Sequence, residues 1–275
     1  MPPPDELPPA REIAPAKLNL ALHVRGCRED GRHDIETVFA FCTDGDRLSA
    51  APDEGLSLEV RGPFAAELGE LEDNLVIRAA QALRDAAEIG DGASLVLHKA
   101  LPVASGIGGG SADAGAALRL LTSLWRINPA HALAVAPALG SDVPACLLSL
   151  PMRGEGAGDR LSPPDLGDLS GTPVLLVNPR RPLSTAAVFA AWDGIDRGPL
   201  GDWREGRNDL EAAAIALVPE IRDVLDWLER CEGATFVHMS GSGATCFAMF
   251  DSGASRDLAA ETVPESWWRL ASHLR

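Results

Sequence analysis

The sequence predicts an α+β fold in which strands and helices are mixed without the regular alternation of βαβ units. Strands are indicated by alternating apolar residues, as in 18–24, where every second residue is leucine or valine. Helices are indicated by apolar residues three and four apart, as after Asn74 and after Ser111. No internal repeat of solenoid or propeller length occurs in the sequence. We therefore expect a mixed fold of one large domain or two smaller ones.

The remaining elements follow from the same patterns along the chain. Strands are expected at 56–60, 95–97, 174–177, 235–239 and 245–250, and helices at 185–192 and from Pro219 onward. The proline-rich start, residues 1–10, is expected to be a disordered leader. A cluster of glycine and proline at 152–164 is typical of a domain boundary. We place an N-terminal domain at 11–152 and a C-terminal domain at 153–275.

Composition excludes several classes of partner. The chain of 275 residues carries 40 acidic and 24 basic side chains, for a net charge of −16. An acidic protein repels nucleic-acid backbones and anionic lipid headgroups, so neither nucleic acid nor a membrane is expected as a partner. The five cysteines never form a C-x-x-C pair, which argues against a disulfide framework and favours reduced thiols in the cytoplasm. Only Lys17 and Lys99 are lysines, so a lysine inside a motif is unusual here.

The stretch GIGGGS, residues 106–111, is the strongest functional signal. Its four glycines stand directly before an apolar helix. Unhindered backbone N–H groups at the positive end of a helix dipole are typical of a phosphate-binding loop. The alternative is a turn that only lets the chain enter the helix. The loop is not a P-loop, because no Gly-Lys pair occurs in the chain, and its glycine spacing does not fit a dinucleotide fingerprint.

A second signal is the strand PAKLNLALHV, residues 15–24. Strand alternation sends Lys17, Asn19 and His23 to the face opposite the leucines, where they form a polar row. The alternative is an ordinary solvated strand edge. The rarity of lysine in this chain weighs against that alternative.

Two further motifs are each open to two interpretations. Asp142 precedes Pro144 and an apolar run, so it is either an N-cap or a carboxylate that acts as a base near phosphate. The SGSG of residues 240–243 is either a hairpin turn or a second glycine loop that contacts phosphate. Two glycine loops in one acidic chain favour a kinase over most binding modules.

Taken together, these stretches resemble the GHMP kinases. The resemblance runs nearly end to end through PAKLNLALHV, DNLVIRAA, GIGGGSADA, GSDVP, NDLE and SGSGATCF. It implies an N-terminal domain of the ribosomal-protein-S5-like type that holds ATP, and a ferredoxin-like C-terminal domain. Among the branches of the family, the motifs are most similar to the one whose acceptor is CDP-methylerythritol, in non-mevalonate isoprenoid biosynthesis.

The resemblance also implies roles for individual residues. Lys17 and Asp142 match the catalytic pair: Asp142 takes the proton of the acceptor hydroxyl, and Lys17 counters the negative charge of the carboxylate and the phosphates. The residues that match ATP contacts are Asn74, Pro102, Ser105, Gly106, Ile107, Gly108, Gly109, Gly110 and Ser111. Those on the substrate side are Asn19, Arg32, His33, Asp142, Thr185 and Phe189. Mg²⁺ is expected with ATP, and no motif in the sequence indicates which residues would bind it.

One position departs from the pattern of that branch. Gly31-Arg32-His33 stands where Gly-Tyr-His is usual, and the chain contains no tyrosine. We expect Arg32 to stack on the cytosine or to pair with the diphosphate. Two alternatives stay open: a nucleotide-binding homologue without catalysis, and a GHMP kinase for homoserine, mevalonate or a sugar. The protein is expected to be a monomer or a weak homodimer.

Overall fold

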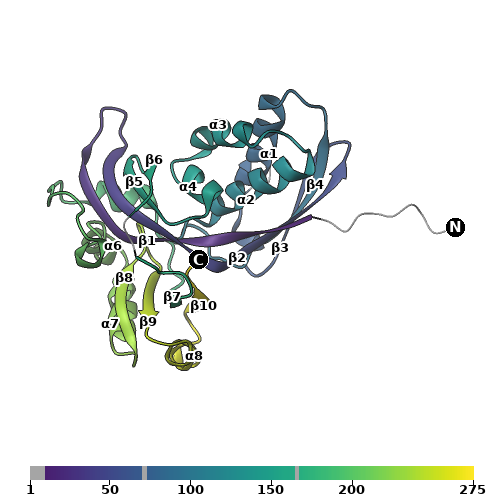
Figure 1. Ribbon diagram of the computed structural model, residues 1–275. Helices are drawn as coiled ribbons and strands as arrows, with labels where there is room; N and C mark the ends of the chain where they lie inside the picture. The colour runs from purple at the N-terminus through teal and green to yellow at the C-terminus, as the bar shows by residue number, and fades with distance from the viewer. Residues whose placement is uncertain (1–9, 70–72, 165–166) are drawn as a thin grey trace. The chain divides into compact units, whose positions relative to one another are not determined.

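The computed structural model describes residues 10–69, 73–164 and 167–275, which form two compact units (Figure 1). The first unit comprises the described residues up to Ala14 together with Gly45–Leu101 and Gly110–Leu148. The second comprises Pro15–Asp44, Pro102–Gly109 and Ser149–Arg275. Each unit draws on separate stretches of chain, and the domain boundary expected near residue 152 stays a prediction. The expected leader lies outside the described residues except for Ala10, where strand β1 begins.

The first unit combines helices with strands. Its strands are β3 (Leu56–Arg61), β4 (Gly92–His98) and the second half of β2 (His33–Asp53). Its helices are the short η1 (Ala65–Glu67), α1 (Leu75–Ala86), α2 (Gly109–Leu124), α3 (Pro129–Leu139) and α4 (Val143–Leu148). Strand β4 pairs in parallel with β3 and antiparallel with β2. Helix α1 packs on β3 and α3, and α3 packs on α4 (Figure 1).

Helix α1 forms where the sequence predicted a capped amphipathic helix. The side chain of Asn74 accepts a hydrogen bond of 2.9 Å from the backbone N–H of Val76, which satisfies one of the free donors of the first turn. The buried residues of the helix are Val76, Ala79, Ala80 and Leu83. Their spacing of three and four residues places them on one face, so burial of that face holds the helix in the unit.

The second unit contains a four-stranded antiparallel sheet in the order β10-β7-β9-β8. The strands are β7 (Pro173–Asn178), β8 (Ala234–Met239), β9 (Cys246–Phe250) and β10 (Trp268–His273). Helices α7 (Glu220–Glu229) and α8 (Gly253–Thr262) pack on this sheet (Figure 1). The unit also holds α5 (Thr185–Ala190), the short η3 (Trp203–Glu205) and α6 (Glu211–Leu217). The strands predicted at 174–177, 235–239 and 245–250 are confirmed, and each predicted end lies within one residue of the observed end.

The second unit also includes strand β1 (Ala10–Cys27) from Pro15 onward and the first half of β2. Strand β2 pairs with β5 (Met152–Gly156), which pairs in turn with β6 (Arg160–Ser162). The glycine- and proline-rich segment at 152–164 therefore contains a β-hairpin. Glycine at 156 adopts a φ of +71°, which suits the turn between the two strands.

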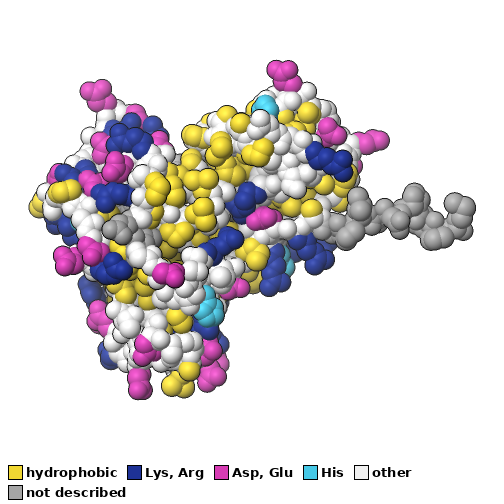
Figure 2. All heavy atoms as spheres, in the orientation of Figure 1, with side chains coloured by type: hydrophobic (Ala, Val, Ile, Leu, Met, Phe, Trp, Pro, Cys, Tyr) yellow, Lys and Arg dark blue, Asp and Glu magenta, His cyan; other side chains and the backbone are white. Residues whose placement is uncertain are grey.

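The α+β class that the sequence predicted is confirmed by this mixture of sheets and helices. Within the described ranges, no helix is long and apolar enough to cross a bilayer. On the face drawn in Figure 2, basic side chains are interspersed among acidic ones. The net charge of −16 therefore coexists with many local pairs of opposite charge.

Candidate active site

Lys17 and Asn19 form a buried polar pair on β1 in the second unit. Lys17 Nζ donates a hydrogen bond of 2.7 Å to Asn19 Oδ1 and lies 4.8 Å from the centre of the Phe39 ring. Each of the two polar residues is only 3% exposed. The alternative of a solvated strand edge is therefore wrong. Burying an ammonium group costs folding free energy unless the group is paired. The hydrogen bond to Asn19 reduces that cost, so the fold holds the two side chains together.

His23, the third residue of the polar row, has a structural role in the second unit. Its Nε2 accepts from the backbone N–H of Arg207 at 3.3 Å, so the proton sits on Nδ1, which donates to Gly198 O at 3.1 Å. Burial lowers the pKa of His23 below its usual range, which keeps the ring neutral. His23 thus holds the segment 198–207 against β1.

The glycine loop lies directly over Lys17 in the same unit. The backbone N–H of Lys17 donates to Ile107 O at 3.0 Å. Gly106 and Gly108 have φ values of +78° and +63°, in the left-handed region that favours glycine. The sequence before the loop is braced by Ser105, whose hydroxyl donates to Pro102 O at 2.7 Å. The backbone conformation therefore requires glycine at these two positions, and the binding of phosphate by the loop stays a prediction.

The SGSG segment joins β8 to β9 as a hairpin connection and also contacts the first glycine loop. Ser240 Oγ donates to Gly106 O at 3.0 Å and accepts from the backbone N–H of Asn19 at 3.1 Å. The backbone N–H of Thr245 donates to Ser105 O at 3.1 Å. Within the second unit, the structure thus brings Lys17, Asn19 and both glycine loops together. The sequence indicates both loops, but no local pattern in it shows that Ser240 joins them.

Helix α2 begins at Gly109, two residues earlier than the sequence predicted, so the glycines lead straight into its N-terminus. Gly110 and Ser111 at the start of α2 belong to the first unit, and they lie near the start of α1. A Cβ built on Gly110 would stand 3.5 Å from Leu75 Cδ1, the residue after Asn74. Two segments predicted to contact ATP therefore adjoin within the first unit, while the ATP contact of Asn74 stays a prediction.

Asp142 belongs to the first unit and directly precedes helix α4. Its backbone carbonyl accepts the first hydrogen bond of that helix, from Cys146 N at 3.0 Å. Its side chain is half-buried. Lys17 belongs to the second unit, so the pairing of Lys17 with Asp142 stays a prediction from the family resemblance.

Residues predicted on the substrate side meet in the second unit. The rings of His33 and Phe189 are stacked, with centres 4.7 Å apart and planes inclined by 30°. Thr185, at the start of α5, shares a hydrogen bond of 2.9 Å with Ser242 of the second glycine loop. Arg32 does not join the rings: its guanidinium donates to Asp30, at 2.8 Å from Nη2 and 3.0 Å from Nε.

Trp192 is a residue of this cluster that sequence reasoning did not assign. Its ring meets that of His33 edge-on, with centres 5.7 Å apart and planes at 84°. The signal that could have found it is spacing, because Trp192 follows Phe189 by three residues at the end of a predicted helix. Trp192 thus adds a third ring to the stacked pair of His33 and Phe189.

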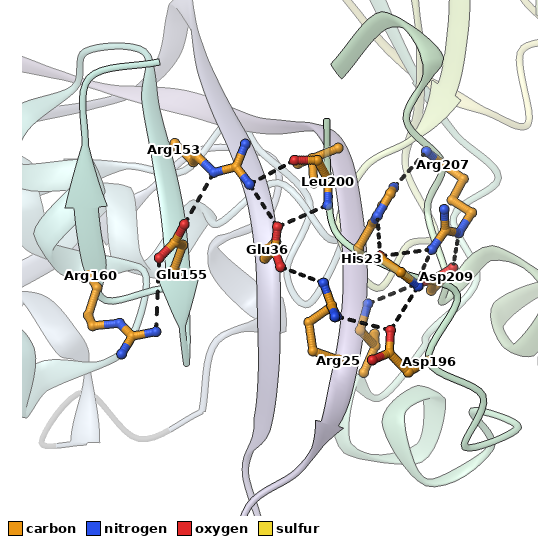
Figure 3. Close-up of polar contacts among 12 residues, drawn as sticks. His23, Arg25, Glu36, Arg153, Glu155, Arg160, Asp196, Leu200, Arg207 and Asp209 are labelled. Carbon is orange, nitrogen blue, oxygen red and sulfur yellow. Dashed lines mark hydrogen bonds and ion pairs between the residues drawn. The ribbon is translucent and has the colours of Figure 1, made fainter. Parts of the chain in front are cut away.

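An ionic network fixes the β1–β2 hairpin that carries His33 (Figure 3). Glu36 accepts hydrogen bonds from Arg25 at 2.7 Å, from Arg153 at 2.7 Å and from the backbone N–H of Leu200 at 2.9 Å. A hollow of about 730 Å³ adjoins the network, lined by Arg25, Arg28, Glu29, Asp30, Asp34, Ile35, Glu36, Glu155, Gly156 and Arg160. The arginines that line the hollow form ion pairs with carboxylates that line it as well: Arg25 with Glu36, Arg28 with Asp34 and Arg160 with Glu155. We therefore assign the hollow no ligand.

In the first unit, the second lysine of the chain is the centre of a buried charge cluster. Lys99 Nζ lies 2.5 Å from Asp46 Oδ2 and 2.7 Å from Asp113 Oδ2, and all three side chains are almost fully buried. Burial raises the pKa of Asp113 to about 7, against the opposing charge of Lys99. Lys99 precedes the glycine loop in sequence and Asp113 follows it. The rarity of lysine is visible in the sequence, but the partners of Lys99 are not, because they are 53 and 14 residues away.

No group of three or more His, Cys, Asp or Glu side chains in the described residues is arranged to hold a metal ion. Mg²⁺ is commonly held by one or two carboxylates together with nucleotide phosphates, so its binding with ATP needs no such group. Mg²⁺ therefore stays an expectation from the family resemblance.

A glycine loop at the start of a helix, in contact with a second glycine loop through Ser240, is the arrangement expected of a small-molecule kinase of the GHMP type. The model of the GHMP kinases N terminal domain matches residues 74–149, and that of the GHMP kinases C terminal domain matches residues 193–268. The chain belongs to the GHMP kinase family, and is thus an ATP-using enzyme with the fold that the resemblance implied.

Particular relatives are similar over nearly the whole chain. The 4-diphosphocytidyl-2-C-methyl-D-erythritol kinase of Novosphingobium aromaticivorans is 51% identical over 271 residues, which cover 96% of this chain and 93% of that one. The enzyme of the same name from Rhizorhabdus wittichii is 51% identical over 277 residues, covering 96% and 94%. A crystal structure of 4-(cytidine 5'-diphospho)-2C-methyl-D-erythritol kinase superposes with a TM-score of 0.83 at 32% identity, covering 96% of this chain and 98% of that one.

Proposed function

We propose that this kinase transfers the γ-phosphoryl group of ATP to the 2-hydroxyl of 4-diphosphocytidyl-2-C-methyl-D-erythritol (CDP-methylerythritol), a step toward isoprenoid precursors. The observation that carries the proposal is the 51% identity, over 96% of the chain, to relatives of that name. The stack of His33 on Phe189 supports it, because both residues are expected to contact the cytosine.

In the proposed reaction, Asp142 accepts the proton of the acceptor hydroxyl. The bond from that oxygen to the γ-phosphorus forms while the bond from phosphorus to the bridging oxygen of ADP breaks. Phosphoryl transfer depends on alignment and charge neutralisation more than on a strong nucleophile. The ammonium group of Lys17 supplies positive charge beside the transferring group, and its burial with Asn19 holds it in place.

The proposed ATP site is the glycine loop at 106–111 with the N-terminus of α2. Gly106 and Gly108 leave backbone N–H groups unhindered, and the start of α2 contributes the positive end of a helix dipole. Mg²⁺ bound with the nucleotide would neutralise phosphate charge. We also propose a cytoplasmic location, which is supported by the free thiols of all five cysteines, each within the described residues.

The proposal is tested by measuring ADP release from ATP and Mg²⁺ with a panel of acceptors. CDP-methylerythritol, homoserine, mevalonate and galactose are each added to the purified chain, and ³¹P NMR identifies the phosphorylated product. We expect stoichiometric ADP release with CDP-methylerythritol and background rates with the other three.

Other results would identify the alternatives. Turnover with another alcohol would keep the family and change the substrate. ATP binding in calorimetry without turnover on any acceptor would indicate a nucleotide-binding homologue that lacks catalysis.

A further inference from the structure

Asn19 sits between two hydrogen-bond partners whose chemistry determines which way its amide points. Its Nδ2 donates to Thr37 Oγ1 at 2.8 Å, and its Oδ1 accepts from Lys17 Nζ at 2.7 Å. Thr37 Oγ1 in turn donates to Ala21 O at 2.6 Å. Lys17 and Asn19 are each 3% exposed and Thr37 is fully buried.

This chain of hydrogen bonds can run in only one direction. An ammonium group only donates, and a backbone carbonyl only accepts. The single hydroxyl hydrogen of Thr37 is committed to Ala21 O, so Thr37 can only accept from Asn19. The amide of an asparagine is ordinarily ambiguous, but here the NH₂ end must face Thr37 and the oxygen must face Lys17.

Strand β2 therefore holds Lys17 in two ways. Thr37 and Phe39 are two residues apart, so their side chains emerge on the same face of β2. Thr37 orients the amide that accepts from Lys17, and the ring of Phe39 lies against the ammonium group itself.

We propose that Thr37 is a positioning residue for phosphoryl transfer, which orients the Asn19 amide so that its oxygen holds the ammonium group of Lys17 in place. The inference rests on the proposed function, in which Lys17 acts at the transferring phosphoryl group. Thr37 itself is two side chains removed from that group. Without its hydroxyl, the buried NH₂ of Asn19 loses its acceptor and the amide is free to turn.

The test compares two substitutions of Thr37 in steady-state kinetics. Thr37→Val keeps the shape and removes the hydroxyl, and it should lower kcat roughly tenfold or more with KM for ATP and acceptor within threefold, because alignment at the reacting atoms is lost. Thr37→Ser restores the hydroxyl and should recover kcat to within threefold of the parent. Thr235→Val is the matched control, because Thr235 on β8 donates to a backbone carbonyl, Met249 O, outside the site.

A double-mutant cycle separates positioning from general stability. In a Lys17→Ala background, Thr37→Val should cause no further loss of kcat, because the group that it positions is gone. Thermal unfolding of each variant establishes that the protein is folded. If Thr37→Val does not fold, Thr37→Ala also lacks the hydroxyl and serves in the same assays.

Several outcomes overturn the inference. It fails if Thr37→Val keeps kcat within twofold of the parent, if Thr37→Ser is as slow as Thr37→Val, or if the losses add in the Lys17→Ala background. In each of these cases the parent still turns over CDP-methylerythritol, and the proposed function stands. A parent chain without turnover on any acceptor is a different result, which overturns the function and this inference with it.

Discussion

Gly108 lies against the side chain of Lys17 so closely that no other residue fits there unchanged. A Cβ built on Gly108 would stand 2.8 Å from Cε of Lys17, well inside ordinary van der Waals contact. The φ of +63° at Gly108 adds a second reason for glycine. The glycine loop and the buried ammonium group are therefore shaped to each other in the second unit.

Gly108→Ala should lower kcat at least about tenfold, because the new methyl group pushes Lys17 from its position. The variant is compared with the parent in ADP release at saturating ATP. Gly171→Ala is the matched control: Gly171 has a φ of +78° with nothing within 4 Å of its Cβ position, so it carries the backbone strain alone. Equal losses of activity in both variants would mean that strain, and not contact with Lys17, matters.

Asp142→Asn should abolish phosphoryl transfer and leave ATP affinity nearly intact. The amide keeps the shape of the carboxylate but does not accept the hydroxyl proton. If Asp142 served only to cap α4, asparagine would replace it almost without effect, since both residues are good N-caps. Turnover within a few-fold of the parent, measured beside ATP calorimetry, would therefore exclude the catalytic role.

The sequence predicts what is local in this protein and misses what depends on distant partners. Alternation places Lys17 and Asn19 on one face of β1, and the glycine pattern predicts the loop and the helix after it. Burial of both faces of β1 is not visible in alternation, because the cover comes from elsewhere in the chain. Ser240 and Gly106 are 134 residues apart, so no local sequence pattern predicts the hydrogen bond between them.

The buried cluster around Lys99 predicts how stability depends on pH. Burial raises the pKa of Asp113 from its ordinary 3.8 to about 7 in the folded state, so between these values the folded state binds a proton that the unfolded state has lost. The stabilisation from that proton is fully present below about pH 4 and is lost as pH rises toward 7. One proton corresponds to a slope of about 1.4 kcal/mol per pH unit.

Asp113→Asn should remove this slope. Urea unfolding of parent and variant at pH 5, 6, 7 and 8 measures the free energy of unfolding. We expect the parent to lose stability toward pH 7 and the variant, which has no proton to release at this position, to change less. Parallel pH profiles for the two proteins would show that Asp113 does not titrate in this range.

Trp192→Ala should raise KM for CDP-methylerythritol with little change in kcat. Trp192 contacts the ring of His33, which stacks on Phe189, and removing one aromatic contact corresponds to a loss of about threefold to tenfold in affinity. Trp267→Ala is the control, because Trp267 contacts Trp227 and not His33. An unchanged KM in Trp192→Ala would mean that the indole only packs against the core.

Arg32 is the position at which the chain departs from its family branch, and its contact with Asp30 suggests a direct test. Both side chains of this pair are largely exposed, so the pair is weak and a substrate diphosphate can replace the carboxylate. If Arg32 binds the diphosphate, Arg32→Ala and Arg32→Tyr should both raise KM for CDP-methylerythritol with kcat unchanged. Asp30→Asn, which removes the competing charge, should lower KM.

If Arg32 stacks on the cytosine instead, Arg32→Tyr should keep the KM of the parent and Asp30→Asn should have little effect. A KM unaltered by Arg32→Ala would exclude both roles, and the cytidine would then be held by His33 and Phe189 without help from this arginine.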